Sequence, residues 1–257
     1  MAELLKGKAA AITGGVSGIG RAIALEYLRQ GACVAINHLG DDWSNNHFKT
    51  MLDEAPKGSK LIGVPGDISK KETAIELVEK TVEAFGKLDV FVSNAGVCKF
   101  AEFLELEKEH FDFTVSINLS GAFYAVQAAA RQMVKQGNGG SIIGISSISA
   151  LVGGGLQTHY TPTKAGILSL MQSCAVALGK YNIRCNALLP GTIRTQLNEE
   201  DLANDEKRKY TETRIPLGRT GVPDDLAGPA VFLASDMSRY VNGAQLLVDG
   251  GFFVNLQ

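Results

Sequence analysis

The sequence is poor in cysteine, tryptophan and proline, with four, one and seven residues of these types among 257. The cysteines match neither a zinc-ligand nor a CxxC spacing, which excludes a zinc finger and a disulfide framework. We expect them to be buried, small apolar residues of a protein that works in a reducing compartment, the cytosol. They are Cys33, Cys98, Cys174 and Cys185.

Charge of one sign is not in excess either, because 25 basic residues face 27 acidic ones and the formal net charge is −2. Such a chain has no overall field that would draw it to nucleic acid. The uncharged stretch 139–163 is interrupted by Ser, Gly, Thr and Gln, and 165–179 is shorter than the roughly 20 apolar residues of a membrane span. Residues 1–8 lack the apolar segment of a signal peptide. We therefore expect a cytoplasmic protein without a nucleic-acid or membrane partner.

Glycine, in contrast, is abundant: 29 of 257 residues, about 11%, against roughly 7% in average proteins. The glycines follow no collagen period, so each needs a local reason. The hydrophobic fraction of 45% suits a globular core and excludes disorder of the whole chain. We predict a single domain over residues 1–257, since α/β folds of this length are commonly undivided.

Short apolar runs alternate with segments of helical periodicity along the chain. The runs are almost continuously apolar, which is typical of strands covered by helices on both faces of a sheet. The pattern predicts an α/β fold of Rossmann type with a doubly wound parallel sheet, and no repeat or linker divides it. The predicted strands are 8–13, 33–37, 61–64, 89–93, 141–145, 183–189 and 245–248, and the predicted helices are 19–30, 69–85, 110–136, 160–181 and 224–234.

The turn after the first predicted strand is rich in glycine and reads Thr13-Gly14-Gly15-Val16-Ser17-Gly18-Ile19-Gly20. Glycines at this point let the backbone approach a pyrophosphate, which the amides of the following helix can bind. The spacing is GxxxGxG rather than the general GxGxxG. Since strand-to-helix turns also use glycine for positive φ alone, a turn without a nucleotide stays an alternative.

Three more predicted strands end in turn-forming residues, namely Gly66-Asp67, Asn94-Ala95-Gly96 and Pro190-Gly191. Any single turn needs residues of this kind. Four such turns at the carboxyl ends of strands, where open α/β sheets bind ligands, favour a nucleotide crevice.

A possible proton-transfer group lies at the start of the helix predicted for 160–181. The i,i+4 spacing puts Tyr160 and Lys164 on one helix face. A neighbouring ammonium favours the phenolate and lowers the pKa of a tyrosine from about 10, which would suit it to proton transfer. Ser147 completes the group, whereas a Tyr-x-x-x-Lys pair taken alone also fits a helix surface.

These residues occur in the order and spacing of the short-chain dehydrogenase/reductase family, which the whole chain resembles. The motifs are Thr13-Gly14-x-x-x-Gly18-x-Gly20, Asn94-Ala95-Gly96, Asn118, Ser147 thirteen residues before Tyr160, Tyr160-x-x-x-Lys164, Pro190-Gly191 and the ending 242–251. The resemblance implies a Rossmann-type sheet of about seven strands, a nicotinamide cofactor and a homotetramer.

The resemblance also implies residue roles. Tyr160 corresponds to the general acid/base and Lys164 to the residue that lowers its pKa and binds the nicotinamide ribose. Ser147 corresponds to the residue that holds the reacting oxygen, and Asn118 to one that holds a water joining Lys164 to solvent. The implied cofactor contacts are Gly14, Ser17, Gly18, Ile19, Gly20, Asn37, His38, Asp67, Ile68, Asn94, Ala95, Gly96, Tyr160, Lys164, Pro190, Gly191, Ile193 and Thr195.

No metal is implied, and the four histidines show no ligand spacing; His159 is expected to line the pocket or pack rather than to act as a base. The choice between NAD and NADP rests on the end of the second strand. An acid there disfavours NADP, but this sequence has Asn37-His38-Leu39-Gly40, with Asp41 and Asp42 just beyond. Ser17 stands where NADP-preferring relatives often have a basic residue, so we expect NAD, with NADP as a second cofactor.

The substrate pocket is expected near a lid of residues 192–221, a long and charge-rich segment. Candidate contacts are Ser147, Gln157, Thr192 and Asn198, which suit a polyhydroxy substrate, although 198–201 also fits the solvated start of a helix. Four segments resemble those of fungal sugar dehydrogenases that act on L-rhamnose at C1, which implies oxidation of L-rhamnose to its lactone. They are 93–98, 157–164, 197–202 and 253–257.

Two other functions stay open from the sequence. A carbonyl reductase of 3-oxoacyl thioesters or small ketones would share the motifs, but its carrier-protein substrate favours a basic entrance patch that the sequence does not show. A nucleotide-sensing regulator without chemistry would tolerate loss of Ser147, Tyr160 or Lys164, and all three are present.

Overall fold

Seven parallel strands form the centre of the computed structural model, which describes residues 3–255. Their order is β3-β2-β1-β4-β5-β6-β7, so the predicted sheet is confirmed. The strands are β1 (Ala9–Ile12), β2 (Cys33–His38), β3 (Leu61–Pro65), β4 (Val90–Ser93), β5 (Gly140–Ile145), β6 (Ile183–Pro190) and β7 (Gln245–Val248).

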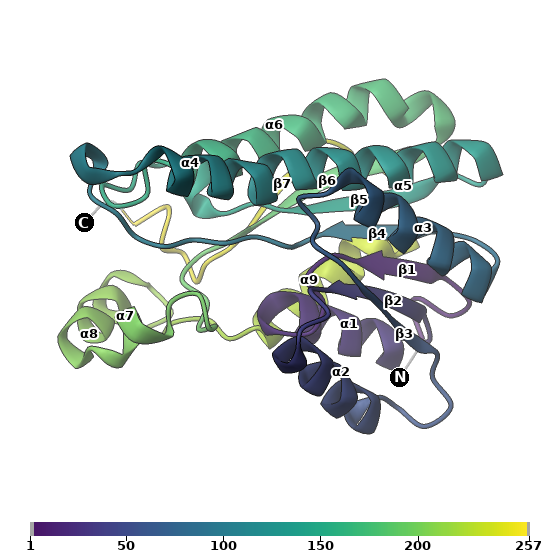
Figure 1. Cartoon of the computed structure of the whole chain (residues 1–257), viewed down its shortest axis with the longest axis horizontal. Helices are drawn as coiled ribbons and strands as arrows, with labels where there is room; N and C mark the ends of the chain where they lie inside the picture. Colours follow the sequence, from purple (N-terminus) through teal and green to yellow (C-terminus); the bar gives the residue numbers. More distant parts are fainter. Residues whose placement is uncertain (1–2, 256–257) are drawn as a thin grey trace.

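Helices cover both faces of this sheet (Figure 1). Alternate strand residues belong to two cores: Ala10 and Ile12 of β1 pack with one group of helices, and Ala11 with the other. The first core includes residues of α1 (Gly18–Arg29), α2 (Asp42–Glu54) and α9 (Asp224–Ala234). The second includes residues of α3 (Lys71–Phe85), α5 (Ala122–Gln136) and α6 (Thr161–Leu178). Both sheet faces are therefore buried, which explains the near-continuous apolar strands.

The strand order reverses at the β1–β4 pair, where Ala10 lies opposite Val90. Chain connections leave the two strands in opposite directions, so a crevice opens beyond their carboxyl ends. The glycine-rich turn follows β1 and Asn94 follows β4. The topology thus brings the predicted cofactor residues to one edge of the sheet.

The helix predicted for 110–136 is divided in the structure. It consists of α4 (Lys108–Val115), a π-helical turn over Ser116–Gly121, and α5. A π turn adds a residue to the helical repeat and occurs often at functional sites. Here it contains Asn118, which is fully buried. Periodicity alone could not show this interruption, because the apolar spacing continues through it.

Three helices lie where no helix was predicted or only a start was suggested. Helix α2 begins after Asp41, whose carboxylate accepts a hydrogen bond from the Ser44 amide. Its sequence is polar, with two buried residues in thirteen, so it lacks a strong apolar stripe. The proposed lid contains α7 (Glu199–Ala203) and α8 (Asp205–Arg214). The suggested helix start near residue 198 is therefore correct. None of the helices within residues 3–255 has the length and apolarity to cross a bilayer.

The prediction of four buried cysteines is wrong for three of them. Only Cys185, inside β6, is buried, whereas Cys33, Cys98 and Cys174 are partly exposed. Cys33 begins its strand and Cys174 lies on α6, so neither is enclosed on all sides. Cys98 lies beside the candidate active site described below.

Candidate active site

The glycine-rich turn has the backbone that its sequence predicts. Gly14 and Gly18 adopt positive φ values of 62° and 51°. A Cβ atom on Gly14 would lie 3.0 Å from the Ala95 Cα, so the turn packs directly on the segment after β4. Ser17 caps the N-terminus of α1 in an extended conformation, and its side chain makes no cap hydrogen bond. The first amides of α1 therefore remain available for an anion, which fits the pyrophosphate of a dinucleotide.

Thr13 and Asn94 connect the two sides of the crevice. The Thr13 hydroxyl accepts hydrogen bonds from the amides of Asn94 (2.9 Å) and Ala95 (3.0 Å). The Asn94 side chain donates to the carbonyls of Thr13 (2.9 Å) and Gly14 (3.0 Å). This arrangement fixes the glycine turn relative to β4. The sequence marked Thr13 only as the first residue of the motif, because its partner lies 81 residues away.

Three predicted catalytic residues meet at the carboxyl end of β5. Ser147 follows β5, and its oxygen accepts a hydrogen bond of 3.1 Å from the Ser149 amide. Its hydroxyl hydrogen is thus left to donate, and the Ser147 side chain is hydrogen-bonded to the Tyr160 phenol. Lys164, one turn further along α6, is 4% exposed, and its ammonium lies 5.5 Å from the centre of the Tyr160 ring.

The electrostatics of the group are dominated by burial. Burial raises the pKa of Tyr160 above its ordinary value of 10, which is opposite to the direction that the spacing of Tyr160 and Lys164 suggested. The Cys98 thiol adds to that rise, and the hydrogen bond from Ser147 opposes it. Burial also lowers the pKa of Lys164 to about 8. The lysine ammonium donates a 3.0 Å hydrogen bond to the Ile145 carbonyl, so it is a buried cation held by a neutral acceptor. A ligand that offers hydroxyl oxygens would suit its other two donors.

Asn118 lies close to Lys164 and holds the segment after β4. Its amide accepts from the Val97 N–H (2.8 Å) and donates to the Val97 carbonyl (2.9 Å). A Cβ atom on Gly96 would lie 3.4 Å from both the Asn118 Oδ1 and the Lys164 Nζ. The structure therefore brings Asn118, Gly96 and Lys164 together, as the motif order implied. Its side chain binds the main chain at Val97.

Two residues at the end of β2 turn their side chains into the protein. Asn37 donates to the carbonyls of Gly66 (2.9 Å) and Val64 (3.3 Å). His38 is 6% exposed and stacks on Phe48, with ring centres 5.6 Å apart. They shape the rim where an adenosine ribose would bind, but they do not project into it.

The remaining predicted cofactor residues are distributed around the same edge. Asp67 is exposed and accepts a 2.9 Å hydrogen bond from the Ser69 amide, and Ile68 is buried beside it. The Thr195 methyl group would lie 3.3 Å from a Cβ on Gly18, so residues 193–195 lie against the glycine turn.

Gly191, a predicted cofactor contact, has a further reason to be glycine, since a Cβ there would lie 2.6 Å from the Asp249 Cβ. The close approach of the segment after β7 therefore requires this glycine.

The candidate substrate residues differ in how far their side chains are already hydrogen-bonded within the protein. Gln157 donates a hydrogen bond of 3.7 Å to the Cys98 sulfur, close to Tyr160 and Lys164. Thr192 lines a cavity of about 150 Å³ together with residues of the 217–225 segment. Asn198 uses both amide atoms on the main chain, accepting from the Thr195 amide (3.0 Å) and donating to the Ile193 carbonyl (2.9 Å). It therefore shapes the base of the lid.

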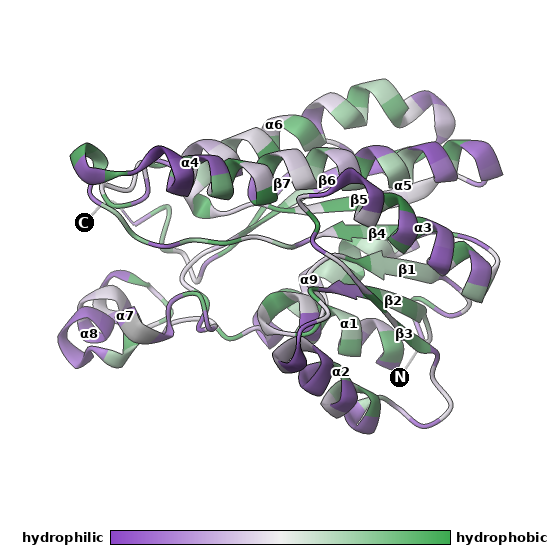
Figure 2. Cartoon of the chain, in the orientation of Figure 1, coloured by the Kyte–Doolittle hydropathy of each residue, from purple (hydrophilic) through white to green (hydrophobic). Residues whose placement is uncertain are grey.

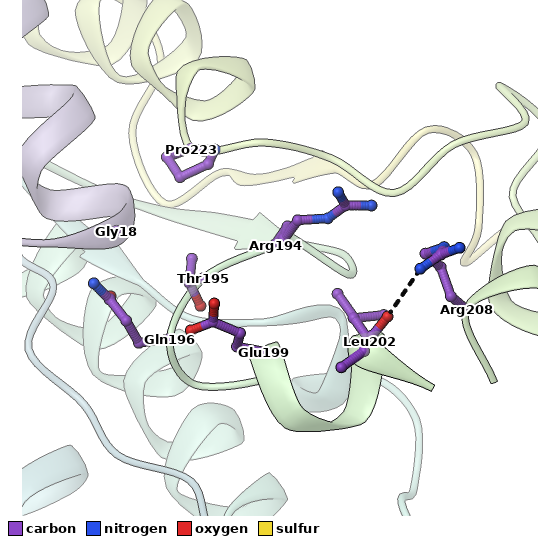
Figure 3. A pocket seen from close by; sticks show the side chains of 9 residues that line it. Gly18, Arg194, Thr195, Gln196, Glu199, Leu202, Arg208 and Pro223 are labelled. Carbon is purple, nitrogen blue, oxygen red and sulfur yellow. Dashed lines mark hydrogen bonds between the residues drawn. The ribbon is translucent and has the colours of Figure 1, made fainter. Parts of the chain in front are cut away.

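A larger cavity of about 480 Å³ lies between the glycine turn and the lid (Figure 3). Gly18 borders it on one side, and Arg194, Thr195 and Glu199 on the other. The Arg208 guanidinium donates to the Leu202 carbonyl at 3.4 Å, a bond within the lid. The cavity leaves room beside the predicted pyrophosphate position and beneath the lid helices. Within the described part of the chain, no cluster of three or more metal-ligating side chains accompanies it.

His159 was expected to line the pocket or to pack, and the structure gives it a specific partner. His159 is completely buried directly before Tyr160, and its Nε2 lies 2.9 Å from the Lys99 carbonyl. The sequence signalled only a histidine beside a catalytic tyrosine, since the partner is 60 residues away.

Comparison with known proteins agrees with this geometry. A family model described as Enoyl-(Acyl carrier protein) reductase matches residues 14–253. The chain is 68% identical, over its full length and that of the relative, to L-rhamnose-1-dehydrogenase of Scheffersomyces stipitis. It is 58% identical to L-rhamnose 1-dehydrogenase (NAD(P)(+)) of Azotobacter vinelandii, over 99% of this chain and 100% of that one. A solved short-chain type dehydrogenase/reductase from Mycobacterium marinum superposes with a TM-score of 0.89 at 34% identity, covering 97% of each chain.

Proposed function

The chain belongs to the short-chain dehydrogenase/reductase family, and from this premise we propose that it oxidises the C1 hydroxyl of L-rhamnose to L-rhamnono-lactone. The observation that carries the proposal is the full-length 68% identity to a protein named for this reaction. The cluster of Ser147, Tyr160 and Lys164 supports it, because the groups needed for proton transfer are all present and close together, with Ser147 and Lys164 buried and Tyr160 partly exposed.

In the proposed mechanism, the Ser147 hydroxyl and Tyr160 bind the C1 oxygen, and Tyr160, after losing its own proton to solvent, takes the C1 hydroxyl proton as the phenolate. The hydrogen bond from the Ser149 amide holds Ser147 as a donor toward the reacting oxygen. Lys164 binds ribose hydroxyls and stabilises the tyrosine anion as a nearby cation. When bound, the nicotinamide supplies the acceptor for the hydride that leaves C1. The 68% identical relative supports the substrate assignment. The fold supports the mechanism, because it brings the catalytic side chains and the predicted cofactor residues to the same edge of the sheet.

We propose NAD as the preferred cofactor, with NADP also accepted. A 2′-phosphate needs a fixed cation near the end of β2 or the glycine turn, and Ser17 offers none. Arg21, the nearby guanidinium on α1, forms a 2.9 Å ion pair with Glu54 and donates to the His47 carbonyl. The relative named for NAD(P)(+) supports use of both cofactors.

The direct test is an aldose panel assayed with NAD and NADP by the absorbance of the reduced nicotinamide. L-rhamnose with NAD is expected to give the highest kcat/KM, and Tyr160→Phe serves as the inactive control. Ketones and a 3-oxoacyl thioester belong in the same panel in the reducing direction. Good ketone or thioester reduction without oxidation of any sugar would overturn the proposal in favour of a carbonyl reductase.

We propose a homotetramer, which exposed apolar side chains on two parts of the surface support. Phe111 and Phe113 on α4 and Phe123 on α5 are 43%, 57% and 45% exposed, and Tyr240 and Val254 near the C-terminal strand are also exposed. Large apolar groups of this kind commonly mark subunit interfaces. Light scattering on the eluting protein is expected to give four times the chain mass; a monomer would contradict the assembly.

We also propose that the whole chain acts as one domain in the cytosol, with 192–221 as its lid. The free thiols of the four cysteines fit a reducing compartment. The lid boundaries are supported by the parallel bridge between Ile193 and Gly221, which closes the base of the segment. Cell fractionation tests the location, and enrichment in a secreted fraction would contradict it.

A further inference from the structure

The hydrogen bonding of His159 defines its chemical form. Its Nε2 faces the Lys99 carbonyl at 2.9 Å, and a carbonyl can only accept. The proton is therefore on Nε2, and Nδ1 carries a lone pair. Within residues 3–255, Nδ1 finds no hydrogen-bond partner. His159 is thus a neutral donor to the main chain, which fits its complete burial.

We propose that His159 is a positioning residue for the sugar substrate. It holds the segment after β4 against the start of α6, so that Cys98 and Gln157 face the C1 oxygen on Tyr160. The inference rests on the proposed function for the identity of the substrate. The geometry of the tie itself does not depend on that identity.

The segment after β4 is anchored on both sides of Cys98. Asn118 binds both main-chain atoms of Val97, and His159 binds the carbonyl of Lys99. Cys98 is thereby held between two neighbours that buried side chains fix to other elements. A third tie, from the Ala101 amide to the Leu156 carbonyl at 3.1 Å, joins the same two segments further out.

The anchored cysteine lies at the catalytic group. Its sulfur accepts the hydrogen bond from the Gln157 amide at 3.7 Å. Its thiol is close enough to Tyr160 to raise the pKa of the phenol, and close enough to Lys164 for the ammonium to lower the pKa of the thiol. Cys98 and Gln157 therefore lie together beside the phenol. A sugar whose C1 oxygen is bound at Tyr160 would place its ring close to these two side chains.

Histidine suits this position because of its shape and its charge. The His110 ring of α4 packs on it, with ring centres 4.5 Å apart and planes at 59°. Burial lowers the pKa of His159, and the neighbouring His110 lowers it further, so the ring stays neutral. A lysine or arginine could donate to the same carbonyl but would bury a charge there. The neutral imidazole supplies the donor without that cost.

The expected consequence is specific to sugar binding. Productive geometry in an active site depends on displacements of about 0.5 Å, which the supporting contacts control. Loss of the tie would let residues 97–101 move away from Gln157 and so weaken the sugar complex. The glycine turn and its ties to Thr13 and Asn94 lie on the other side of the crevice, and they do not involve His159.

The test compares His159→Leu with His159→Gln in the full-length protein. The glutamine amide nitrogen reaches the position of Nε2 and can donate to Lys99, whereas leucine cannot. The leucine variant is expected to raise KM for the sugar about ten-fold, the loss of one buried hydrogen bond. The kcat of the leucine variant is expected to change less than about three-fold, and its Kd for NAD is expected to stay unchanged. The glutamine variant is expected to have a KM for the sugar close to that of the parent protein.

His47→Leu is the matched control, since the His47 ring bonds the Trp43 carbonyl and packs on the Trp43 ring, both within its own helix α2. Its KM for the sugar is expected to equal that of the parent. A folded leucine variant with unchanged KM would overturn the proposal, and so would equal changes in KM and in Kd for NAD.

Where the leucine variant does not fold, His159→Asn replaces it, because the shorter amide occupies the place of Nδ1 and cannot reach Lys99. Equal KM values for the asparagine and glutamine variants would then overturn the proposal. If the parent protein does not oxidise L-rhamnose, the proposed function fails. The same comparison is then made with the aldose that it does oxidise.

Discussion

The catalytic segment and the lid, residues 146–164 and 192–221, are built in opposite ways. Most of the chemically important side chains of the first are below 10% exposed, including Ser147, His159 and Lys164. His159 and Lys164 bind main-chain carbonyls outside the segment, those of Lys99 and Ile145. Helix α8 of the lid has no buried residue in its ten positions, and α7 inserts Leu202. Figure 2 shows α8 as one of the most hydrophilic helices of the molecule, set apart from the sheet.

The difference shows which segment of this fold is held rigidly and which can open locally. Burial with fixed hydrogen bonds holds reacting groups in one geometry. Ion pairs between exposed side chains hold the lid, for example Lys207 with Asp201 at 2.6 Å and Arg208 with Asp205 at 2.6 Å. Such pairs contribute at most about 1 kcal/mol each. We therefore expect the lid to open locally at low free energy while the catalytic segment stays closed.

The largest effect is expected when the catalytic segment loses its proton acceptor. Tyr160→Phe removes one oxygen and keeps the ring, so the packing and the cofactor edge remain. Turnover is expected to fall about 10³-fold, while NAD binding, followed by fluorescence titration, stays nearly unchanged. Retained turnover would show that another group transfers the proton.

Removal of the buried cation is expected to separate activity from stability. The pKa of Lys164 is lowered from 10.5 to about 8, so below pH 8 the folded protein carries a charge that burial disfavours. Lys164→Met is expected to lower turnover about 10²-fold and to raise the unfolding midpoint in urea at pH 7. The difference in stability between Lys164→Met and the parent protein is expected to shrink as the pH rises from 8 toward 10.5, where the lysine of the unfolded chain also loses its proton.

Lys207→Met in the lid is the matched control for this variant, since it removes an exposed lysine from α8. Its free energy of unfolding is expected to stay within about 0.5 kcal/mol of that of the parent protein. Destabilisation by Lys164→Met would show that the hydrogen bond to Ile145 outweighs the burial of charge.

Acid is expected to lower the free energy of unfolding first through two buried histidines and only at lower pH through the ion pair at the lid base. Burial lowers the pKa of His159 and His38 below 6.5, so the unfolded chain binds protons that the folded one does not. Stability is therefore expected to fall as the pH drops below 6.5, by at most about 1.4 kcal/mol per pH unit for each histidine.

At the lid base, the Arg219 guanidinium and the Val222 amide lower the pKa of Asp225 from 3.8 to about 2. That contribution is present above pH 3.8 and is lost only as the pH falls toward 2. Denaturant curves between pH 7 and 4 check the order. Stability that stays level down to pH 5 would contradict it.

The smallest perturbation is a brief digestion with protease. The first cuts are expected within 199–214, because α8 has no buried residue and the short α7 is held to the rest of the protein through Leu202. L-rhamnose with NAD is expected to slow these cuts several-fold, while sorbitol with NAD is not. Early cleavage within 146–164 would reverse the comparison between the two regions.

Much of the fold could be predicted because its signals are local. The boundaries of α9 and β7 agree with the prediction to the residue, and the other strands agree within one or two. Continuous apolar runs mark buried parallel strands wherever they occur. Helix α2 was missed for the same reason, since it buries only Ser44 and Met51 and carries little apolar periodicity.

For the candidate site too, the features that depend on local sequence could be predicted, and those that depend on distant partners could not. The sequence alone determined that Tyr160 and Lys164 share a helix face, that a glycine turn follows β1, and that polar turns meet at one sheet edge. These follow from the helical repeat and from parallel strands, and their spacing identified the family. Tertiary structure alone decided which partner each buried polar group would take.

Asn118 binds Val97, Asn94 binds Thr13, His159 binds Lys99, and Asp249 requires a glycine at 191. Each pair is separated by 21 to 81 residues. A buried donor must find an acceptor, but no local pattern shows which of the distant carbonyls the folded chain will bring to it.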